Sequence, residues 1–506
     1  MALRRGLHKI SFNRPLSIMT SSVTHADSAI ELDPKESLFV KHLDEFSQSL
    51  KPVVECRIAG GWVRDKLLRL PSSDLDVALS TASGYQFALN FVEHLRARDI
   101  STGTVGKVAA NPEQSKHLET GTTRIMDLEC DFVGLRSETY ADSRIPTEVR
   151  LGTPLEDAQR RDLTINALFY NVHTRQVEDW TGYGLADLRN RIARTPLPPR
   201  QTFVDDPLRV VRCVRFASRF DLVIEDEVMR AIDRDDIKVE LRSKVSKERI
   251  GSETLKIMQK TPLRGLTLID RLNLHSSIFT CAVDPPRSDA LTAGMVLSAV
   301  LPRLKVEPDE ILWLAAALYP FRDLVVQGKK PTPAVASVIG EGLKLSNETR
   351  DGVTKLFIGA KIVADSLDAT SRSTLGLTLR HPSVQPLWHR TLCWSAVMAV
   401  MEEWSGAWDD KSDGILTRFL AFEDRVRELD LEPEIGRRPL LDGKRIQEVL
   451  SLKPGPILQI ITENVVAWQL DHPGSTQTEC EEWLRESWEG RKRVEWEATA
   501  TVKKRK

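Results

Sequence analysis

Two aspartates separated by one residue, Asp74 and Asp76, have the spacing of a metal-binding pair. Polar and apolar residues alternate over residues 72–80, which predicts a β-strand. Side chains on a strand alternate between its two faces, so both carboxylates share one face and Leu75 lies on the other. Neighbouring carboxylates repel each other unless a cation lies between them, and hard oxygen ligands suit Mg²⁺. Asp74 and Asp76 are therefore our candidate Mg²⁺ ligands and catalytic residues for phosphoryl transfer, although this spacing alone also arises by chance.

The segment before this pair contains two adjacent glycines, Gly60 and Gly61, followed closely by Arg64. Glycines let backbone N–H groups approach a triphosphate closely, and an arginine can bind a phosphate oxygen. An isolated glycine pair would indicate only a turn. A second Asp-x-Asp, formed by Asp233 and Asp235, has no such glycine segment before it, and we expect it to have arisen by chance.

A third carboxylate is expected near such a metal pair. Residues 127–131 alternate as a strand would, so Asp127, Glu129 and Asp131 are expected to point to one face. We select Asp131 as the third catalytic carboxylate. The alternative is a solvent-exposed strand face without a catalytic role.

These motifs together resemble a known family. Gly-Gly-x-Val-Arg-Asp followed by Asp-x-Asp is similar to the first motif of the polymerase-β-like nucleotidyltransferases. The chain resembles more closely the bacterial and eukaryotic (class II) CCA-adding enzymes, of fungal type, and their relatives, the bacterial poly(A) polymerases. Further matching segments follow in the order of the family, at residues 131–136, 156–168, 205–209 and 246–250. Gly134, Ala158 and Tyr183 depart from the family pattern, and none of them removes a candidate catalytic group.

The resemblance implies an enzyme that adds C, C and A to the 3′ end of tRNA without a nucleic-acid template. CTP and ATP would be its substrates, two Mg²⁺ ions its cofactors and tRNA its partner, and we expect a monomer. A CC-adding, A-adding or poly(A)-adding relative is an alternative, because the base-selecting residues do not separate these activities. An RNA-binding protein without catalysis is a further alternative, against which the intact pair of Asp74 and Asp76 argues.

A helix is predicted to begin at residues 153–156, because Thr-Pro-Leu-Glu is a capping box with proline at the first helical position. We expect this helix to carry Arg160, Arg161 and Asp162. The resemblance implies that Arg161 and Asp162 hold the triphosphate and sugar of the incoming nucleotide, with Asp162 accepting from the ribose 2′-hydroxyl. Our nucleotide-binding candidates in this segment are Arg160, Arg161, Asp162 and Asn166, and they join Gly60, Gly61 and Arg64 in one set. The alternative is a set of surface ion pairs such as Glu156 with Arg160.

The resemblance also assigns base selection to Asp206 and Arg209. Cytosine and adenine each present an amino donor beside a ring-nitrogen acceptor, and a carboxylate next to a guanidinium satisfies both groups. Uracil and guanine present the reverse order and would leave buried polar groups unpaired, so they are rejected. The alternative for Asp206 is an N-cap, with Pro207 as the first residue of the following helix.

An arginine stripe follows these residues. On a helix, Arg209, Arg212, Arg215 and Arg219 would lie within about a third of the circumference. We include Arg212 among the nucleotide-binding candidates, and the stripe could follow a phosphate backbone. An ordinary solvated helix face is the alternative.

A hinge between head and neck is implied by the resemblance at Asp179, Gly182 and Asp187, where it would let the site change between C and A addition. From the residues alone, the glycines of this segment indicate only a turn. Residues 111–120 are polar and resemble the family's mobile loop for the final A. An ordinary surface loop is the alternative.

The order of these motifs predicts an α+β fold over the 506 residues, with a polymerase-β-like nucleotidyltransferase head followed by an all-α neck, body and tail. Strand-like and helical stretches alternate up to a proline-rich segment at 195–199, and helical periodicity dominates after it. The predicted boundaries are a presequence at 1–35, the head at 36–195, the neck at 196–265, the body at 266–400 and a tail with a basic end at 401–506.

Composition excludes some classes of protein. Apolar runs are too short to cross a bilayer, so no membrane contact is expected, and six scattered cysteines indicate a reducing compartment. A net charge of −1 does not by itself indicate a nucleic-acid partner. The first 26 residues contain basic but no acidic residues, as in mitochondrial transit peptides. We predict a mitochondrial form from Met1 and a cytoplasmic and nuclear form from Met19, with a disordered basic tail as the alternative.

Overall fold

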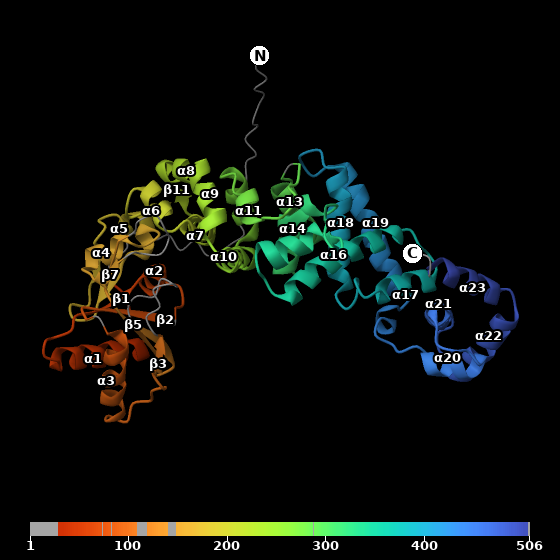
Figure 1. Ribbon diagram of the computed structural model, residues 1–506, viewed down its shortest axis with the longest axis horizontal. Coiled ribbons are helices and arrows are strands. Elements are labelled where there is room, and N and C mark those ends of the chain that lie inside the picture. Colours follow the sequence, from red (N-terminus) through yellow and green to blue (C-terminus); the bar gives the residue numbers. More distant parts are fainter. Residues whose placement is uncertain are drawn as a thin grey trace, which may run out of the picture. The chain divides into compact units, whose positions relative to one another are not determined.

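The computed structural model describes residues 29–72, 74–81, 83–108, 119–139, 148–286 and 288–503 (Figure 1). Most of the predicted presequence, with Met19, lies outside the described residues, as do positions 111–118 of the predicted loop and the last three residues of the basic end. The chain divides into two compact units. The first contains the residues up to Asp206 together with Leu222–Val228, and the second contains Pro207–Asp221 and the residues from Met229 onwards.

A seven-stranded sheet forms the centre of the first unit, in the order β3-β4-β5-β2-β1-β8-β9. Its strands are β1 (Cys56–Ala59), β2 (Asp74–Leu79), β3 (Gly106–Val108), β4 (Thr120–Ile125), β5 (Leu128–Gly134), β8 (Phe169–Asn171) and β9 (Val177–Glu178). β2 and β5 run parallel, and the other neighbouring pairs of this sheet are antiparallel. A parallel pair needs a long crossover, which here contains α3 (Gly84–Arg96), β3 and β4.

The sheet has one apolar and one polar face around β2. Leu75 and Val77 are buried, whereas Asp74 and Asp76 are exposed, which confirms the predicted alternation. This pattern leaves both carboxylates on the face that the core does not use.

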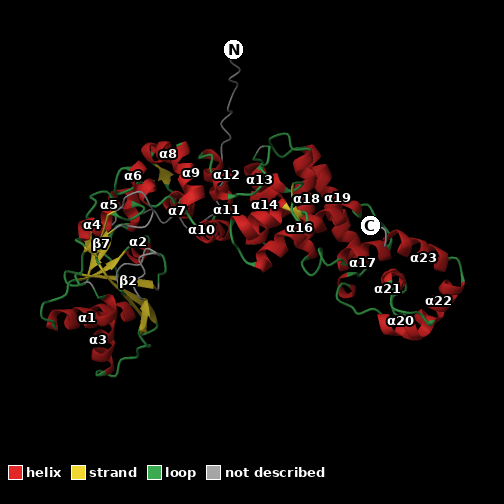
Figure 2. Ribbon diagram, in the orientation of Figure 1, coloured by secondary structure: helices red, strands yellow, loops and turns green. Residues whose placement is uncertain are grey.

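Helices α1 (Pro34–Ser49) and α3 cover the apolar face (Figure 2). The rings of Phe87 and Phe91 on α3 lie 5.7 and 5.9 Å from the ring of Phe132 on β5, centroid to centroid. Phe46 of α1 packs against both α3 rings at 5.4 and 5.3 Å. Aromatic burial of this kind dominates the energy of a small core, so these rings anchor both helices to the sheet.

A buried carboxylate joins α1 to the helix that follows β1. Glu36 forms a capping box with Asp33, and its side chain is almost completely buried. The same carboxylate accepts hydrogen bonds from Trp62 Nε1 at 3.0 Å and from Lys66 Nζ at 2.5 Å. Trp62 and Lys66 both belong to α2 (Gly61–Leu67), so Glu36 fixes α2 against α1. Helix α1 begins at Pro34, inside the segment 1–35 that was assigned to the presequence.

The turn between β4 and β5 corrects one expectation. Met126 and Asp127 both adopt positive φ, 50° and 67°, so Asp127 lies in a tight turn and not on the strand face with Glu129 and Asp131. Aspartate tolerates this left-handed conformation, which alternation of residue types does not reveal. The Asp127 carboxylate forms an ion pair with Lys35 Nζ at 2.8 Å.

Shorter elements complete the first unit. They are the antiparallel pair β6 (Arg136–Thr139) and β7 (Glu148–Leu151), α4 (Pro154–Gln159), the 3₁₀ turn η2 (Thr164–Asn166), α5 (Gly184–Asn190), α6 (Pro199–Asp205), and the parallel pair β10 (Ile192–Ala193) and β11 (Val223–Ile224).

The second unit is helical, as predicted for the neck, body and tail, apart from the short pair β12 (Val325–Val326) and β13 (Thr332–Pro333). The α-helices that begin after Asp206, of which α8 begins within the first unit, are α7 (Leu208–Arg219), α8 (Asp226–Ile232), α9 (Asp235–Lys244), α10 (Lys247–Lys260), α11 (Pro262–Arg271), α12 (His275–Ile278), α13 (Ala290–Arg303), α14 (Glu310–Leu318), α15 (Ala334–Ser337), α16 (Asn347–Asp365), α17 (Arg372–Arg380), α18 (Trp388–Glu402), α19 (Asp410–Glu428), α20 (Gly443–Leu450), α21 (Pro456–Asp471), α22 (Gln477–Glu489) and α23 (Lys492–Lys503).

The last four of these helices enclose a hydrophobic core of their own, in which Ile446, Ile461, Val465 and Leu484 are buried. The finer boundaries between neck, body and tail stay predictions. Within the described ranges, no helix has the length and apolarity needed to span a membrane.

We expect Glu36→Ala to lower the free energy of unfolding by about 3 kcal/mol, because the Trp62 N–H and the Lys66 ammonium would lose their buried acceptor. Urea denaturation followed by tryptophan fluorescence measures the change. Glu45→Ala on the same helix is the matched control. Glu45 contacts Lys41 at 3.9 Å in an exposed pair, and its removal should cost less than about 1 kcal/mol. Equal losses in both variants would contradict the role of Glu36.

Candidate active site

The polar face of the sheet brings the predicted catalytic residues together. Parallel pairing of β2 with β5 sets Asp76 opposite Asp131 and Asp74 opposite Glu129. Directly paired residues on neighbouring strands point to the same face. Asp74, Asp76 and Asp131 therefore form a carboxylate group on two adjacent strands.

Burial and neighbouring like charges raise the pKa of two of these carboxylates, Asp76 and Asp131. Asp76 keeps contact with solvent, yet the surrounding protein atoms desolvate its carboxylate. Burial thus raises the pKa of Asp76 against the opposing charge of Arg161, and Asp74 adds to the increase. Burial also raises the pKa of Asp131, and the charges of Asp76 and Asp74 raise it further. A cation between these carboxylates would relieve the repulsion.

The donor set fits Mg²⁺ only in part. Among the described residues, no three His, Cys, Asp or Glu side chains are grouped closely enough to hold an ion by themselves. Mg²⁺ is usually bound by one or two carboxylates together with substrate phosphates and water. Asp74 and Asp76 would therefore supply the protein's share of a coordination sphere that a nucleotide completes.

A second buried carboxylate, Asp157, gathers arginines beside this face. Its oxygens lie 2.9 Å from Arg160 Nη2 and 2.9 Å from Arg161 Nη2, and one of them accepts from the Arg136 backbone N–H at 3.0 Å. Burial alone would raise the pKa of Asp157, but Arg160 and Arg161 hold it well below its usual range. The charges of Arg136 and Arg161 also act on Asp76, so positive charge lies next to the carboxylate group.

Glycine at position 60 meets two requirements at the start of α2. Gly60 adopts φ 71°, which is unfavourable for residues with a Cβ atom. A Cβ atom there would also lie 2.7 Å from Arg161 Nη1. Gly60 is the N-cap of α2 and Gly61 is its first residue, so the predicted glycine pair forms a helix start beside Arg161.

Arg64 is buried in a network that reaches the nucleotide-binding candidates. Its Nη1 donates to Asn166 Oδ1, and its Nε donates to Asp65 Oδ1 at 2.8 Å. Asn166 Nδ2 in turn donates to Asp162 Oδ1 at 2.9 Å. The structure therefore joins Arg64, Asn166 and Asp162, which the sequence analysis placed in one set without predicting their contacts.

The helix expected after residues 153–156 is present but shorter than predicted. Thr153 Oγ1 accepts from Glu156 N at 3.3 Å and Thr153 N donates to Glu156 Oε2 at 2.7 Å, so the capping box is confirmed. Helix α4 ends at Gln159, however, and Arg160, Arg161 and Asp162 follow it instead of lying on it.

Side chains explain this early end. Asp162 Oδ1 accepts from the backbone N–H of Leu163 at 2.8 Å, shortly after the last helical residue. An aspartate that bonds to neighbouring backbone competes with helix formation. Arg160 pairs with Asp157 and Glu138 in place of the considered partner Glu156.

The predicted hinge contains a side-chain cap. Asp179 Oδ1 accepts from Gly182 N at 3.1 Å and from Thr181 Oγ1 at 2.8 Å, and its Oδ2 accepts from Leu185 N at 3.0 Å. Gly182 adopts φ 74° with open space around it, so backbone conformation alone favours glycine there. Asp179 thus fixes the turn that leads into α5.

Asp187 connects this turn to the nucleotide-binding segment. It is buried on α5 and accepts from Thr164 Oγ1 at 2.7 Å and from Arg194 Nε at 3.1 Å. Thr164 begins η2, shortly after Asp162, and Arg194 also pairs with Glu225 at 2.5 Å. Asp179 and Asp187, two of the three predicted hinge residues, therefore fix the hinge segment through side-chain hydrogen bonds.

The predicted base-selecting residues belong to different units. Asp206 is the C-cap of α6 at the end of the first unit, and Arg209 lies in the first turn of α7 in the second. Pro207 is the N-cap of α7, so the helix begins one residue later than the capping alternative for Asp206 places it. Arg209 is buried, and Arg212 Nη1 lies 3.9 Å from the carboxylate of Glu253.

Sequence reasoning assigned no role to Asp157 or Arg136. The spacing of Asp157 from Arg160 and Arg161 is visible in the sequence as an i,i+3 and i,i+4 pattern, which could have revealed the ion pairs. The contact of the Arg136 backbone N–H with Asp157 depends on the path of the chain from β5 into β6. No local sequence pattern predicts this contact.

Comparison with known proteins now decides the family. A poly A polymerase head domain matches residues 56–194. The tRNA nucleotidyltransferase cca1 of Schizosaccharomyces pombe is 33% identical over 89% of this chain and 96% of its own length. The mitochondrial CCA tRNA nucleotidyltransferase of Saccharomyces cerevisiae is 36% identical over 84% of this chain and 86% of its own. The chain belongs to the CCA tRNA nucleotidyltransferases. It is thus an enzyme of the class that the motifs predicted.

Solved CCA-adding enzymes share the fold of this family member. A complex with CTP aligns at a TM-score of 0.61 and 20% identity over 91% of this chain and 97% of the other. The Thermotoga maritima enzyme complexed with tRNA aligns at 0.58 and 19% over 90% and 96%. The predicted order of a nucleotidyltransferase head followed by helices is confirmed.

We expect Asp157→Asn to lower the free energy of unfolding at pH 7 by about 3 kcal/mol, because Arg160 and Arg161 would keep their charges without the buried partner. The depressed pKa means that the charged Asp157 stabilises the fold above the pKa of the unfolded chain. This contribution is lost as pH falls, so the difference between the two proteins should shrink below about pH 5.

Urea denaturation at several pH values measures both effects. Asp99→Asn makes the same chemical change at an exposed position of the same unit, and it should leave stability within about 0.5 kcal/mol at every pH. A difference for Asp157→Asn that stays constant down to about pH 2 would argue against the ion pairs.

Proposed function

We propose that this enzyme adds C, C and A in turn to the 3′ end of tRNA, from CTP and ATP and without a nucleic-acid template. The parallel register that sets Asp76 beside Asp131, with Asp74 on the same face, is the observation that carries the proposal. Family membership supports the substrates, because relatives are named for this reaction and solved enzymes of the fold contain CTP, ATP or tRNA.

In this proposal Asp74 and Asp76 hold two Mg²⁺ ions, and Asp131 is the third catalytic carboxylate. When bound, the ions favour ionisation of the attacking 3′-hydroxyl and neutralise charge on the α-phosphate and the leaving pyrophosphate. The rigid strands β2 and β5 fix the carboxylates before substrate arrives, so little reorganisation is needed during the reaction.

The arginines beside this face bind the triphosphate. Asp157 holds Arg160 and Arg161 in place, which reduces the side-chain entropy that phosphate binding would otherwise cost. The shielded Nε of Arg136 has no hydrogen-bond partner among the described residues, and we assign it to the same anion. Gly60 and Gly61 let the start of α2 approach the phosphates.

The ribose is recognised by Asp162, whose carboxylate accepts from the 2′-hydroxyl that a deoxynucleotide lacks. Asn166 donates to the same carboxylate, and Arg64 holds Asn166 from α2. Arg64 therefore positions the ribose site through Asn166, in addition to its expected contact with a phosphate.

Asp206 and Arg209 select the base, as the pattern of donors and acceptors on cytosine and adenine requires. The hinge residues Asp179, Gly182 and Asp187 precede this pair in the chain. We assign to this hinge the switch from C to A addition.

We also propose two cellular forms. The relatives from Saccharomyces cerevisiae and Candida glabrata are named as mitochondrial, which supports a mitochondrial form that starts at Met1. A start at Met19 would remove most of the basic segment and give a cytoplasmic and nuclear form.

Incubation with single nucleotides tests the product. We expect a tRNA that lacks its last three nucleotides to gain two with CTP and Mg²⁺, a third only when ATP is also present, and none with UTP. Denaturing gels resolve these products. Arrest after CC would show a partial enzyme, and long A tails would favour the poly(A)-adding alternative.

Asp76→Asn tests the catalytic carboxylates. Loss of one metal ligand should remove about 4 kcal/mol of transition-state stabilisation, which lowers kcat about a thousandfold. The rate of CTP incorporation at saturating substrates measures it. Asp235→Asn changes the other Asp-x-Asp, whose first-turn position on α9 is exposed, and it should keep near-normal activity. Near-normal activity of Asp76→Asn would instead leave the catalytic assignment without support.

A further inference from the structure

The arginine stripe of α7 divides into two parts. Arg215 Nε donates to the buried carboxylate of Glu253 at 2.5 Å, and Arg212 Nη1 lies 3.9 Å from the same carboxylate. Arg219 is exposed and forms no ion pair within the described part of the chain; its guanidinium lies 4.9 Å from the ring of Phe220. The end of the stripe therefore keeps a cation whose charge no acid of the described chain neutralises.

A small cavity lies at this end of α7. It has a volume of about 90 Å³ and is lined by Arg215, Arg219, Lys256, Gln259, Lys260 and Thr261. Four of these residues are cationic and none is acidic. Lys260, like Arg219, has no ion pair among the described residues, whereas Lys256 contacts Glu253 at 3.3 Å. The cavity thus has an excess of positive charge, which in water favours an anion.

The side chain of Thr261 adds to this preference. Thr261 is both the C-cap of α10 and the N-cap of α11. An N-cap hydroxyl normally accepts from a backbone N–H of the first turn, but α11 has no side-chain cap. Thr261 Oγ1 is shielded from solvent and has no hydrogen-bond partner in the described residues. A hydroxyl with an unused donor suits a phosphate oxygen.

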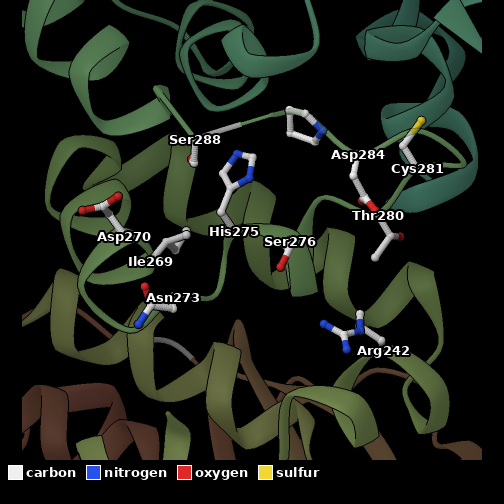
Figure 3. A pocket seen from close by; sticks show the side chains of 11 residues that line it. Arg242, Ile269, Asp270, Asn273, His275, Ser276, Thr280, Cys281, Asp284 and Ser288 are labelled. Atoms are coloured by element: carbon white, nitrogen blue, oxygen red, sulfur yellow. The ribbon is translucent and has the colours of Figure 1, made fainter. Parts of the chain in front are cut away.

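A larger cavity of the second unit lacks these properties (Figure 3). It has a volume of about 570 Å³, and its lining includes Arg242 together with the acids Asp270 and Asp284. His275 also lines it, but burial lowers the pKa of His275, and the ring is held by the Ala317 carbonyl at 2.9 Å. The acids outnumber the cation, so an anion is expected in the small cavity and not in this one.

We propose that the cavity between α7, α10 and α11 binds a backbone phosphate of the RNA substrate. This proposal rests on the proposed function and adds a contact outside the reacting centre. Arg209 and Arg219 are about 15 Å apart along α7, at about 1.5 Å per residue. The triphosphate of the incoming nucleotide is already assigned to Arg160 and Arg161, which leaves the phosphodiesters of tRNA as the anions that the cavity would bind.

The test is the salt dependence of tRNA binding by the double variant Arg219→Gln/Lys260→Gln. Each lost phosphate contact lowers the slope of log K against log[KCl] by about 0.7–0.9, so a loss of about 1–2 is expected with the two charges. Fluorescence anisotropy measures the binding of a tRNA transcript that lacks CCA, at KCl concentrations from about 50 to about 200 mM.

Two matched variants complete the test. Lys329→Gln/Lys330→Gln removes the same charge from an exposed loop and should leave the slope unchanged. Arg219→Lys/Lys260→Arg keeps both charges in the cavity, so this variant should retain most of the wild-type slope. Thermal melting by circular dichroism confirms that each variant is folded.

The outcomes separate the two proposals. An unchanged slope in the double glutamine variant overturns the phosphate site, while addition of CCA by the wild-type protein would still support the proposed function. A selective loss of CTP affinity would place the anion site in nucleotide binding and also overturn it. If the wild-type protein adds no nucleotide to the same transcript, the proposed function fails whatever the slope.

Discussion

Parallel pairing of β2 with β5 places like charges side by side, and much of the first unit serves to make this arrangement tolerable. Asp74, Asp76 and Asp131 could not stay charged together in an apolar interior. The sheet therefore separates its two faces, with α1 and α3 packed on the apolar one. On the other face the carboxylates keep contact with solvent and with the charges of Arg136 and Arg161. The carboxylates and the arginines that face them come from segments far apart in the sequence. The helices α1 and α3, which support the sheet, contribute no residue to the reaction.

The same physical device occurs in both units, since each uses a buried acid to fix two arginines. Asp157 holds Arg160 and Arg161, and Glu253 is in contact with Arg212 and Arg215. An arginine side chain loses considerable rotamer entropy when it binds an anion. A carboxylate that fixes the guanidinium beforehand has already met this cost during folding. The acid lowers the net positive charge near the arginines, but it holds each guanidinium in an orientation that can bind a phosphate.

Local sequence patterns predicted the features that depend on neighbouring residues. Alternation placed Asp74 and Asp76 on one face, and the capping box gave the start of α4. Patterns failed where side chains override propensity, as at the end of α4, or where a left-handed turn intervenes, as at Asp127. Glu36 was not found because a glutamate on an amphipathic helix normally indicates an exposed position. The contacts of the helical second unit with RNA could not be read at all, since periodicity shows which face is buried and not what the other face binds.

The position of Glu36 also sets a limit on maturation of the protein. Helix α1 precedes the segment matched by the head-domain family, yet its buried carboxylate holds α2, and α2 carries the glycine start of the nucleotide site. A processing peptidase that cut beyond Asp33 would remove the capping residue and free the start of α1. A processed form that keeps this cap would therefore have its N-terminus at or upstream of Asp33. A polypeptide that starts at Met19 satisfies this condition, so an imported and a cytosolic enzyme would share one intact head.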